Sequence, residues 1–354
     1  MDNTHMTGLL RDMLRARAFE EAAAQSYTQG EIVGFLHLYP GEEAVAVGVL
    51  HAAEPGDYIV STYREHVHAL VRGIPARAIM AELYGKKTGV SAGMGGSMHI
   101  FDRERRFLGG YAIVGETLPI ALGAAYAVAY RRLPEAVLCF FGDGAVNQGT
   151  FHESLNMAAL WRLPILFVCE NNHYQIGTEI HRHSAITDVY KRACGYGIPA
   201  EQADGMDVLA VHAAARRLLD RVRGGDGPQF LELSTYRFRG HSMADPGTYR
   251  PQAEVKAHEA ADPIAAAIHE ISLSYPSRAE LAASDRDSLK RFADHCCQGG
   301  HLDDAALKRL QAEVQAEIDD AVRHARESPA PTLDDAWDAL LRNRRFETLL
   351  ENLP

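Results

Sequence analysis

The sequence predicts an α/β protein in which a parallel sheet is flanked by helices and followed by a helical C-terminal extension. Apolar stretches typical of buried strands alternate with helical patterns as far as about residue 235, which is the order found in parallel sheets. Beyond a long loop, the remaining pattern is helical. We therefore divide the chain into an α/β domain, residues 1–265, and a helical extension, residues 266–354.

Helices dominate the prediction before residue 135. We expect a short strand at residues 57–62 and helices at residues 7–27, 42–53, 76–84 and 117–130. The alanine-rich helix at 117–130 should be buried and closely packed through its small side chains. The loop at residues 30–41 carries His37. The stretch 85–96 is rich in glycine and contains Lys86 and Lys87, so we expect a mobile or ligand-facing loop there.

Residues 136–174 contain the most informative pattern in the chain. A strand, a helix and a second strand, together one βαβ unit, are predicted at residues 136–141, 150–161 and 164–169. Gly142, Asp143 and Gly144 follow the first strand, and Asn172 follows the second. Parallel strands bind ligands at their carboxyl ends, which meet at one edge of the sheet. Asp143 and Asn172 should therefore lie close together.

Asp143 is unusual inside a glycine turn of the phosphate-binding type. Backbone N–H groups in such turns bind phosphate, and a carboxylate there repels a diphosphate unless a cation lies between them. Mg²⁺ suits this position because it takes few protein oxygen ligands and completes its shell with phosphate and water. Asp143, the amide oxygen of Asn172 and a main-chain carbonyl just beyond it would supply the protein's ligands.

Other interpretations of this turn are simpler. A Gly-Asp-Gly sequence alone is a common turn. The dinucleotide-binding fingerprint requires a third glycine where Asn147 stands. The P-loop requires lysine after its last glycine, Gly149, where this chain has Thr150. A nucleotide-binding Rossmann protein is therefore disfavoured, although it stays open as an alternative.

The second half of the chain begins with further α/β elements. Helices are expected at residues 188–196 and 207–223, with a strand at 228–233. Residues 236–250 contain glycine and proline without periodicity, so we expect a long functional loop that is poorly packed by itself. In the tail, one charged amphipathic helix is predicted from apolar residues that recur every three or four positions, namely Leu307, Leu310, Val314, Ile318 and Val322.

Composition limits the classes of partner. The formal net charge of −11 argues against nucleic acid or an acidic membrane as the main partner. The five cysteines include no CxxC pair, which suits a reducing compartment and disfavours a disulfide framework or a zinc site. The longest nearly uncharged run, 117–130, is too short to span a bilayer. Without a secretory pattern at the N-terminus, we expect a cytoplasmic protein.

Several stretches together resemble one enzyme family. They are GFLHL (34–38), STYREH (61–66), GMGGSMH (93–99), AIVG (112–115), the GDG and NN of the central unit, DGMD (204–207) and YRFRGHSMADPGTYR (236–250). This set resembles the alpha subunits of the thiamine diphosphate-dependent pyruvate dehydrogenase component, in the 2-oxo acid dehydrogenase family. The resemblance implies the parallel-sheet thiamine diphosphate-binding fold, with thiamine diphosphate and Mg²⁺ as cofactors.

The resemblance also assigns roles to individual residues. Mg²⁺ would be bound by the side chains of Asp143 and Asn172 and by the main-chain carbonyl of Tyr174. Contacts to thiamine diphosphate would come from Tyr63, Arg64, Ala112, Val114, Asp143, Gly144, Ala145 and Asn172. His37 and His241 would lie near the diphosphate and the substrate as catalytic residues.

Partners follow from the same resemblance. In this family, the acid that activates the cofactor comes from a separate beta subunit, and this chain contains no second α/β domain to supply it. We therefore expect an α₂β₂ assembly that decarboxylates pyruvate and passes the acetyl group to the lipoyl arm of an acyltransferase core. Acetoin or another 2-oxo acid is the alternative substrate. A non-catalytic regulatory subunit, like the Rossmann protein above, is an alternative from another class.

Overall fold

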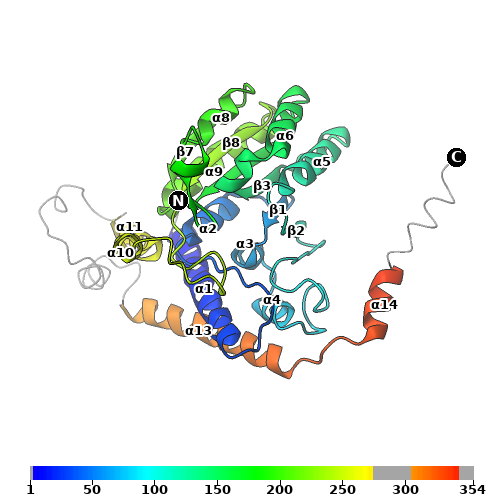
Figure 1. Ribbon diagram of the computed structural model, residues 1–354, viewed down its shortest axis with the longest axis vertical. Helices are drawn as coiled ribbons and strands as arrows, with labels where there is room; N and C mark the ends of the chain where they lie inside the picture. The colour runs from blue at the N-terminus through cyan, green and yellow to red at the C-terminus, as the bar shows by residue number, and fades with distance from the viewer. Residues whose placement is uncertain (1–2, 274–303, 343–354) are drawn as a thin grey trace, which may run out of the picture.

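The structure is a computed structural model, and it describes residues 3–273 and 304–342 (Figure 1). Its centre is a sheet of six parallel strands in the order β2–β1–β3–β4–β8–β7. These strands are β1 (Tyr58–Thr62), β2 (Phe107–Tyr111), β3 (Val137–Gly142), β4 (Ile165–Asn171), β7 (Ala200–Asp204) and β8 (Gln229–Ser234). A separate antiparallel pair consists of β5 (Tyr174–Gln175) and β6 (Thr178–Glu179). The predicted α/β class with a parallel sheet is confirmed.

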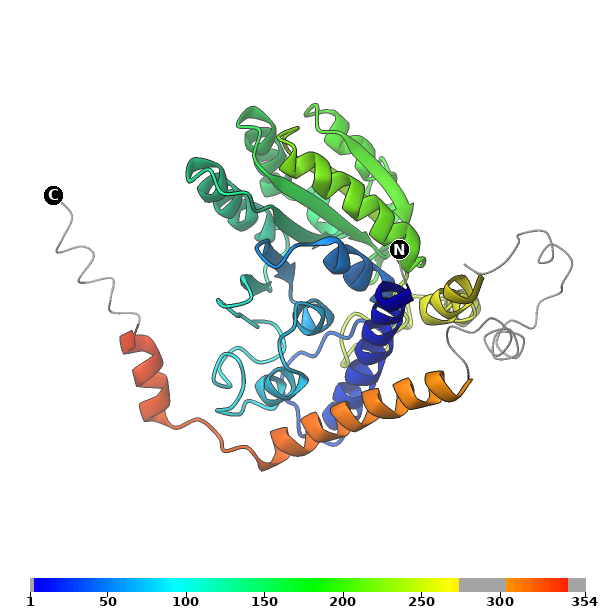
Figure 2. The ribbon, with the colours of Figure 1, turned by 180° about the vertical axis from the view of Figure 1, so that it is seen from behind.

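Helices cover both faces of the sheet (Figures 1 and 2). One face carries α1 (Asn3–Thr28), α2 (Glu43–Ala52), α3 (His66–Val71), α4 (Ala76–Leu83) and α9 (Val208–Arg223). The other carries α5 (Thr117–Tyr130), α6 (Gly149–Leu160) and α8 (Tyr190–Cys194). The short helix α7 (Ile180–His183) follows β6. The predicted βαβ unit is confirmed as β3, α6 and β4.

The central strands are buried on both faces, which explains their continuous apolar sequence. In β3, Leu138 and Phe140 pack into the core beneath α2 and α9, whereas Cys139 and Phe141 pack into the core beneath α5 and α6. This alternation follows from the two-residue period of a strand. Both cores therefore hold the carboxyl end of β3 in place.

The described parts of the C-terminal region, up to residue 273 and from residue 304 to 342, are helical, as predicted. They comprise α10 (Gln252–Glu259), α11 (Pro263–Leu273), α13 (Asp304–Glu327) and α14 (Leu333–Arg342). Helix α13 runs across α1 and α4 and buries Leu310, Val314 and Ile318 against them. Two ion pairs, Arg15–Glu317 and Arg11–Glu313, add to this contact. Helix α14 lies apart from the rest in both views (Figures 1 and 2). The boundary at residue 265 stays a prediction.

Helix α5 is not buried all round, contrary to our expectation, because Tyr126 and Tyr130 on one of its faces are 50% and 79% exposed. The glycine-rich stretch 85–96 is held by one carboxylate, and its role as a mobile or ligand-facing loop stays a prediction. Glu82 accepts hydrogen bonds at 2.7–3.1 Å from the backbone N–H groups of Ser91, Gly93, Gly95 and Gly96.

None of the helices in the described ranges combines the length and the apolar composition needed to cross a membrane. The cytoplasmic location stays a prediction.

Candidate functional site

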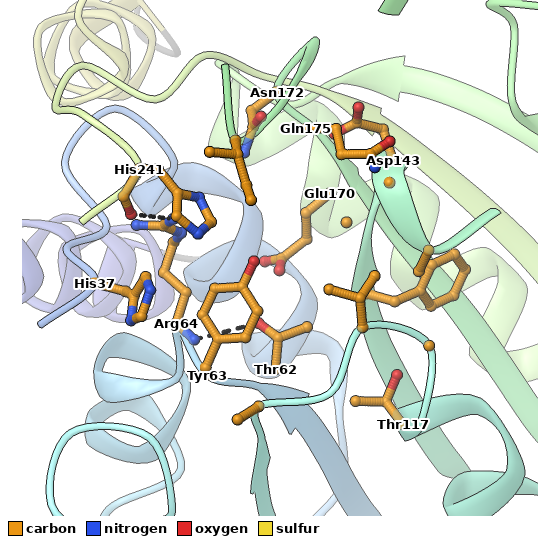
Figure 3. Close-up of a pocket in the computed structure, with 18 of the residues that line it drawn as sticks. His37, Thr62, Tyr63, Arg64, Thr117, Asp143, Glu170, Asn172, Gln175 and His241 are labelled. Atoms are coloured by element: carbon orange, nitrogen blue, oxygen red, sulfur yellow. Dashed lines mark hydrogen bonds between the residues drawn. The ribbon is translucent and has the colours of Figure 1, made fainter. Parts of the chain in front are cut away.

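A cavity of about 320 Å³ opens at the carboxyl ends of β1, β2, β3 and β4 (Figure 3). It lies where the chain leaves β1 toward β2 on one side and leaves β3 toward β4 on the other, the switch point at which open parallel sheets bind ligands. All the predicted site residues line it: His37, Tyr63, Arg64, Ala112, Val114, Asp143, Gly144, Ala145, Asn172, Tyr174 and His241. Residues from distant parts of the sequence are thus brought together.

The predicted glycine turn is the start of a short 3₁₀ helix, Asp143–Asn147, directly after β3. Asp143 is 2% exposed, and its Oδ2 atom is buried without a hydrogen-bond partner. A Cβ atom at Gly144 would lie 2.9 Å from the Gln175 side chain, so only glycine fits here unless Gln175 moves. The first N–H groups of a helix have no partner within it, which leaves those at the cavity free to bind an anion.

Asn172 and Tyr174 reach the same cavity because the residue between them reverses the chain. His173 adopts φ 67°, a left-handed conformation that is uncommon for a residue other than glycine. The Asn172 amide nitrogen donates a 3.0 Å hydrogen bond to the Glu42 carboxylate, and its oxygen accepts one of 3.2 Å from the Tyr174 N–H. The carboxylate of Asp143, the amide oxygen of Asn172 and the carbonyl of Tyr174 are the hard donors that fit a divalent cation such as Mg²⁺.

Arg64 and Arg237 are both buried arginines that line the cavity, and Arg64 joins three segments. Its guanidinium donates to the Leu38 carbonyl and, at 2.9 Å, to the His241 carbonyl. Its Nε atom lies 3.8 Å from Glu42 Oε2. Burial and the nearby Arg237 lower the pKa of Arg64 from its ordinary value. The carbonyl groups do not neutralise the guanidinium charge, and the one carboxylate beside it, Glu42, is 3.8 Å away. Arg64 can therefore still bind an anionic ligand.

His37, Tyr63 and His241 form a cluster of rings beside Arg64 (Figure 3). The ring centroids of His37 and Tyr63 are 4.5 Å apart, and those of His37 and His241 are 5.0 Å apart. Burial, followed by the charge of Arg64, lowers the pKa of His37 to about 2 and that of His241 to about 4. Both imidazoles are therefore neutral near pH 7 and can exchange hydrogen bonds with a substrate without adding charge.

Two further carboxylates line the cavity, and sequence reasoning missed both. Glu170 accepts hydrogen bonds from the Tyr39 hydroxyl and, at 3.1 Å, from His68 Nε2. Glu42 binds Asn172, and burial raises its pKa to about 7. A signal for Glu170 was present, since it lies in the same strand as Asn171, just before Asn172. No sequence pattern pointed to Glu42, the residue just before α2.

The loop at residues 236–250 is well packed, contrary to our expectation. Arg250 is 6% exposed, donates to the carbonyls of Arg237 and Arg239, and lies over the ring of Tyr236 at 5.2 Å. Asp245 accepts from the N–H groups of His241 and Gly247 at 2.6 and 2.9 Å, and from the Tyr249 hydroxyl at 2.8 Å. The loop therefore holds His241 at the cavity.

Comparisons with known proteins agree with this arrangement. The family model described as "Dehydrogenase E1 component" matches residues 11–274. A pyruvate dehydrogenase E1 component subunit alpha of Porphyra purpurea is 43% identical, over 92% of this chain and 90% of its own length. The corresponding subunit of Rhizobium meliloti is 41% identical, over 94% and 88%. The chloroplastic subunit alpha-3 of Arabidopsis thaliana is 42% identical, over 91% and 71%.

Proposed function

Because the chain belongs to the dehydrogenase E1 component family, we propose that it is the alpha subunit of a pyruvate dehydrogenase component that acts with thiamine diphosphate and Mg²⁺. The observation that carries this proposal is the convergence of every predicted cofactor and catalytic residue on one cavity at the switch point of the sheet. Acetoin or another 2-oxo acid is the alternative substrate. Curated relatives named as pyruvate dehydrogenase alpha subunits favour pyruvate.

Thiamine diphosphate, when bound, supplies a carbon nucleophile for the 2-oxo group and a ring that accepts the electron pair released with CO₂. Asp143, Asn172 and the Tyr174 carbonyl would hold Mg²⁺. Arg64 and Tyr63, with the N–H groups of Gly144 and Ala145, would bind the diphosphate, and the backbones of Ala112 and Val114 would contact the aminopyrimidine. The buried Asp143 carboxylate at the cavity and the close approach of Gly144 to the Gln175 side chain support this fit.

His37 and His241 would act on the substrate. Their lowered pKa values keep them neutral at physiological pH. A neutral imidazole can donate a hydrogen bond from one nitrogen to a substrate oxygen and accept one at the other. The ring Nδ1 atoms of both residues are buried and have no hydrogen-bond partner in the described chain, so both are available to a bound molecule.

Full activity would require a beta subunit. The described carboxylates that line the cavity are Glu42, Asp143 and Glu170, and each is engaged with other groups or assigned to the cation. The acid that activates the cofactor would therefore come from the partner in an α₂β₂ assembly. Exposed apolar side chains at the cavity mouth, Ile113 at 70% and Ile176 at 60%, support a protein partner there. A lipoyl-bearing acyltransferase core would receive the acetyl group.

The test is decarboxylation of 2-oxo acids by the chain co-expressed with its beta subunit. We expect turnover of pyruvate that depends on thiamine diphosphate and Mg²⁺, none by the chain alone, and less with branched 2-oxo acids. Acetoin, which has no carboxylate to lose, is tested separately by the acetaldehyde that its cleavage releases, and less of this product is expected. Asp143→Asn should abolish Mg²⁺-dependent cofactor binding in calorimetry, whereas Asp220→Asn, at an exposed carboxylate on α9, should not. Binding of NAD in place of thiamine diphosphate, or full activity of the isolated chain, would contradict the proposal.

A further inference from the structure

We infer that His183 is a positioning residue for Asp143: its Nε2–H faces the carboxylate oxygen Oδ2 and orients the carboxylate toward the cation. This inference rests on the proposed function, in which Asp143 is a Mg²⁺ ligand. His183 is not among the residues that line the cavity, so it contacts Asp143 from outside it. No sequence pattern marks this residue.

The contact is close and shielded from water. His183 Nε2 lies 3.2 Å from Asp143 Oδ2, and the two side chains are 9% and 3% exposed. Both atoms are buried, and their alignment falls short of a hydrogen bond. Neither has another hydrogen-bond partner among the described residues, so each is the polar counterpart of the other. A small rotation of the ring would complete the bond, and a buried carboxylate oxygen strongly favours such a donor.

The neighbours of His183 determine which ring nitrogen carries the proton. Arg192 can only donate, and its Nη1 atom lies 2.7 Å from Asn147 Oδ1. This fixes the orientation of the Asn147 amide, whose Nδ2 group then faces His183 Nδ1 at 3.2 Å as a donor. The Ser184 hydroxyl lies 3.0 Å from the same ring nitrogen. Nδ1 is therefore the acceptor, and Nε2 carries the hydrogen that points at Asp143.

A second histidine in the same short helix shows what an ordinary surface histidine looks like. His181, two positions earlier, has a side chain that is 72% exposed, and its polar contact is with Glu179 at 3.6 Å. The His183 side chain, in contrast, is only 9% exposed, and both its ring nitrogens face polar groups of η1, the 3₁₀ helix Asp143–Asn147. Its placement thus links Arg192 and Asn147 to the carboxylate through one chain of donors and acceptors.

Outer hydrogen-bond partners matter because a ligating carboxylate must present one oxygen to the metal in a fixed direction. Loss of such a partner typically weakens metal binding by about 10- to 100-fold. With His183 removed, Asp143 Oδ2 would be buried without a donor, and the carboxylate would be free to rotate away from the cavity. We therefore expect weaker cation binding without loss of the fold.

The experiment measures Mn²⁺ binding, by electron paramagnetic resonance of the free ion, to the full-length chain co-expressed with its beta subunit and saturated with thiamine diphosphate. His183→Ala should weaken Mn²⁺ binding by about tenfold. His183→Gln, which can place an amide N–H near the same position, should recover most of the affinity. His181→Ala is the matched control and should bind Mn²⁺ as the wild type does. The thermal unfolding midpoint without cofactor or metal should be the same in all four proteins.

Asp143→Asn separates failure of this inference from failure of the proposed function. If Asp143→Asn loses Mn²⁺ binding but His183→Ala keeps wild-type affinity, Asp143 is a ligand and His183 does not position it. Equal losses in His183→Ala and His183→Gln would also overturn the inference, because the donor would not be the relevant property. If Asp143→Asn binds Mn²⁺ normally, the proposed cation site itself is wrong.

Discussion

His37 combines deep burial with a titratable ring, and this has a consequence for stability. It is 6% exposed, and burial together with Arg64 lowers its pKa to about 2. An unfolded histidine titrates near pH 6.5. As the pH falls below 6.5, the unfolded chain binds a proton at this position that the folded chain does not. The free energy of unfolding therefore falls as the pH drops below 6.5. The contribution of the buried, neutral His37 to stability is complete only above that pH.

We predict that His37→Asn makes the acid loss of stability shallower. Each titrating group of this kind contributes up to about 1.4 kcal/mol per pH unit between its folded and unfolded pKa values. The unfolding free energy of the cofactor-free protein, measured between pH 6 and pH 4, should therefore fall with a slope smaller by about that amount in the variant. His181→Ala, at an exposed position, should keep the wild-type slope. Parallel curves for His37→Asn and the wild type would refute the prediction.

At the scale of elements, sequence patterns identified the strands that are buried on both faces and missed the two at the edges. Strands β3 and β4 are continuous apolar runs because helices cover both of their sides. The edge strand β2 reads FLGGY, where two glycines obscure the pattern, and the other edge strand, β7, reads AEQAD and is largely polar. An edge strand is specified by its pairing with a neighbour, which a local pattern does not contain.

The loop at residues 236–250 shows the same limit. Its glycine and proline content correctly predicts an irregular segment, but it carries no sign of the contacts that hold Arg250 against three tyrosine rings, those of Tyr174, Tyr236 and Tyr249. Arg237 is likewise 2% exposed and donates to the Tyr249 hydroxyl at 3.0 Å. Both arginines stabilise the loop from within.

We predict that trypsin distinguishes a loop packed in this way from a mobile one. In the wild type without cofactor, trypsin should cut slowly after both the buried Arg237 and Arg239, which lies in the same packed loop; Arg250 precedes Pro251, a bond that trypsin does not cut. Asp245→Ala removes three hydrogen bonds to a carboxylate, a cost on the order of 3 kcal/mol, so cleavage after Arg237 should rise roughly 100-fold.

The control for this experiment is Thr248→Ala, at an exposed position in the same loop, which should leave the cleavage pattern unchanged. Mass spectrometry of the fragments identifies each cut. Rapid cleavage of the wild type after Arg237 would show that the loop is mobile after all. An Asp245→Ala variant as resistant as the wild type would show that the carboxylate does not hold it.

At the scale of the whole molecule, some site residues can be predicted from sequence motifs, whereas others can be identified only from the folded structure. The motifs contain the groups proposed to touch cofactor and substrate, and all of these line one cavity. Glu42 and His183 contact Asn172 and Asp143 from segments far away in the sequence. No spacing rule connects such pairs, because the distance between them is set by the packing of the sheet and its helices.

The isolated chain leaves an aromatic cluster exposed at the C-terminal ends of α5 and α6. Tyr126 lies 6.2 Å from Tyr130 and 5.5 Å from Trp161, and Leu160 beside them is 71% exposed. A contiguous apolar surface of this kind is typical of a stable protein interface. We expect this surface to contribute to the contact with the proposed beta subunit.

We predict that Tyr130→Lys combined with Leu160→Lys separates the chain from its beta subunit. Two charges buried in an apolar contact should weaken association at least about 100-fold, so the tagged variant should no longer copurify with the partner. The isolated variant should also self-associate less than the isolated wild type in analytical ultracentrifugation, because the exposed apolar area is smaller. Ala213→Lys, exposed on α9 across the sheet, should copurify normally. Undiminished copurification of the double variant would place the interface elsewhere.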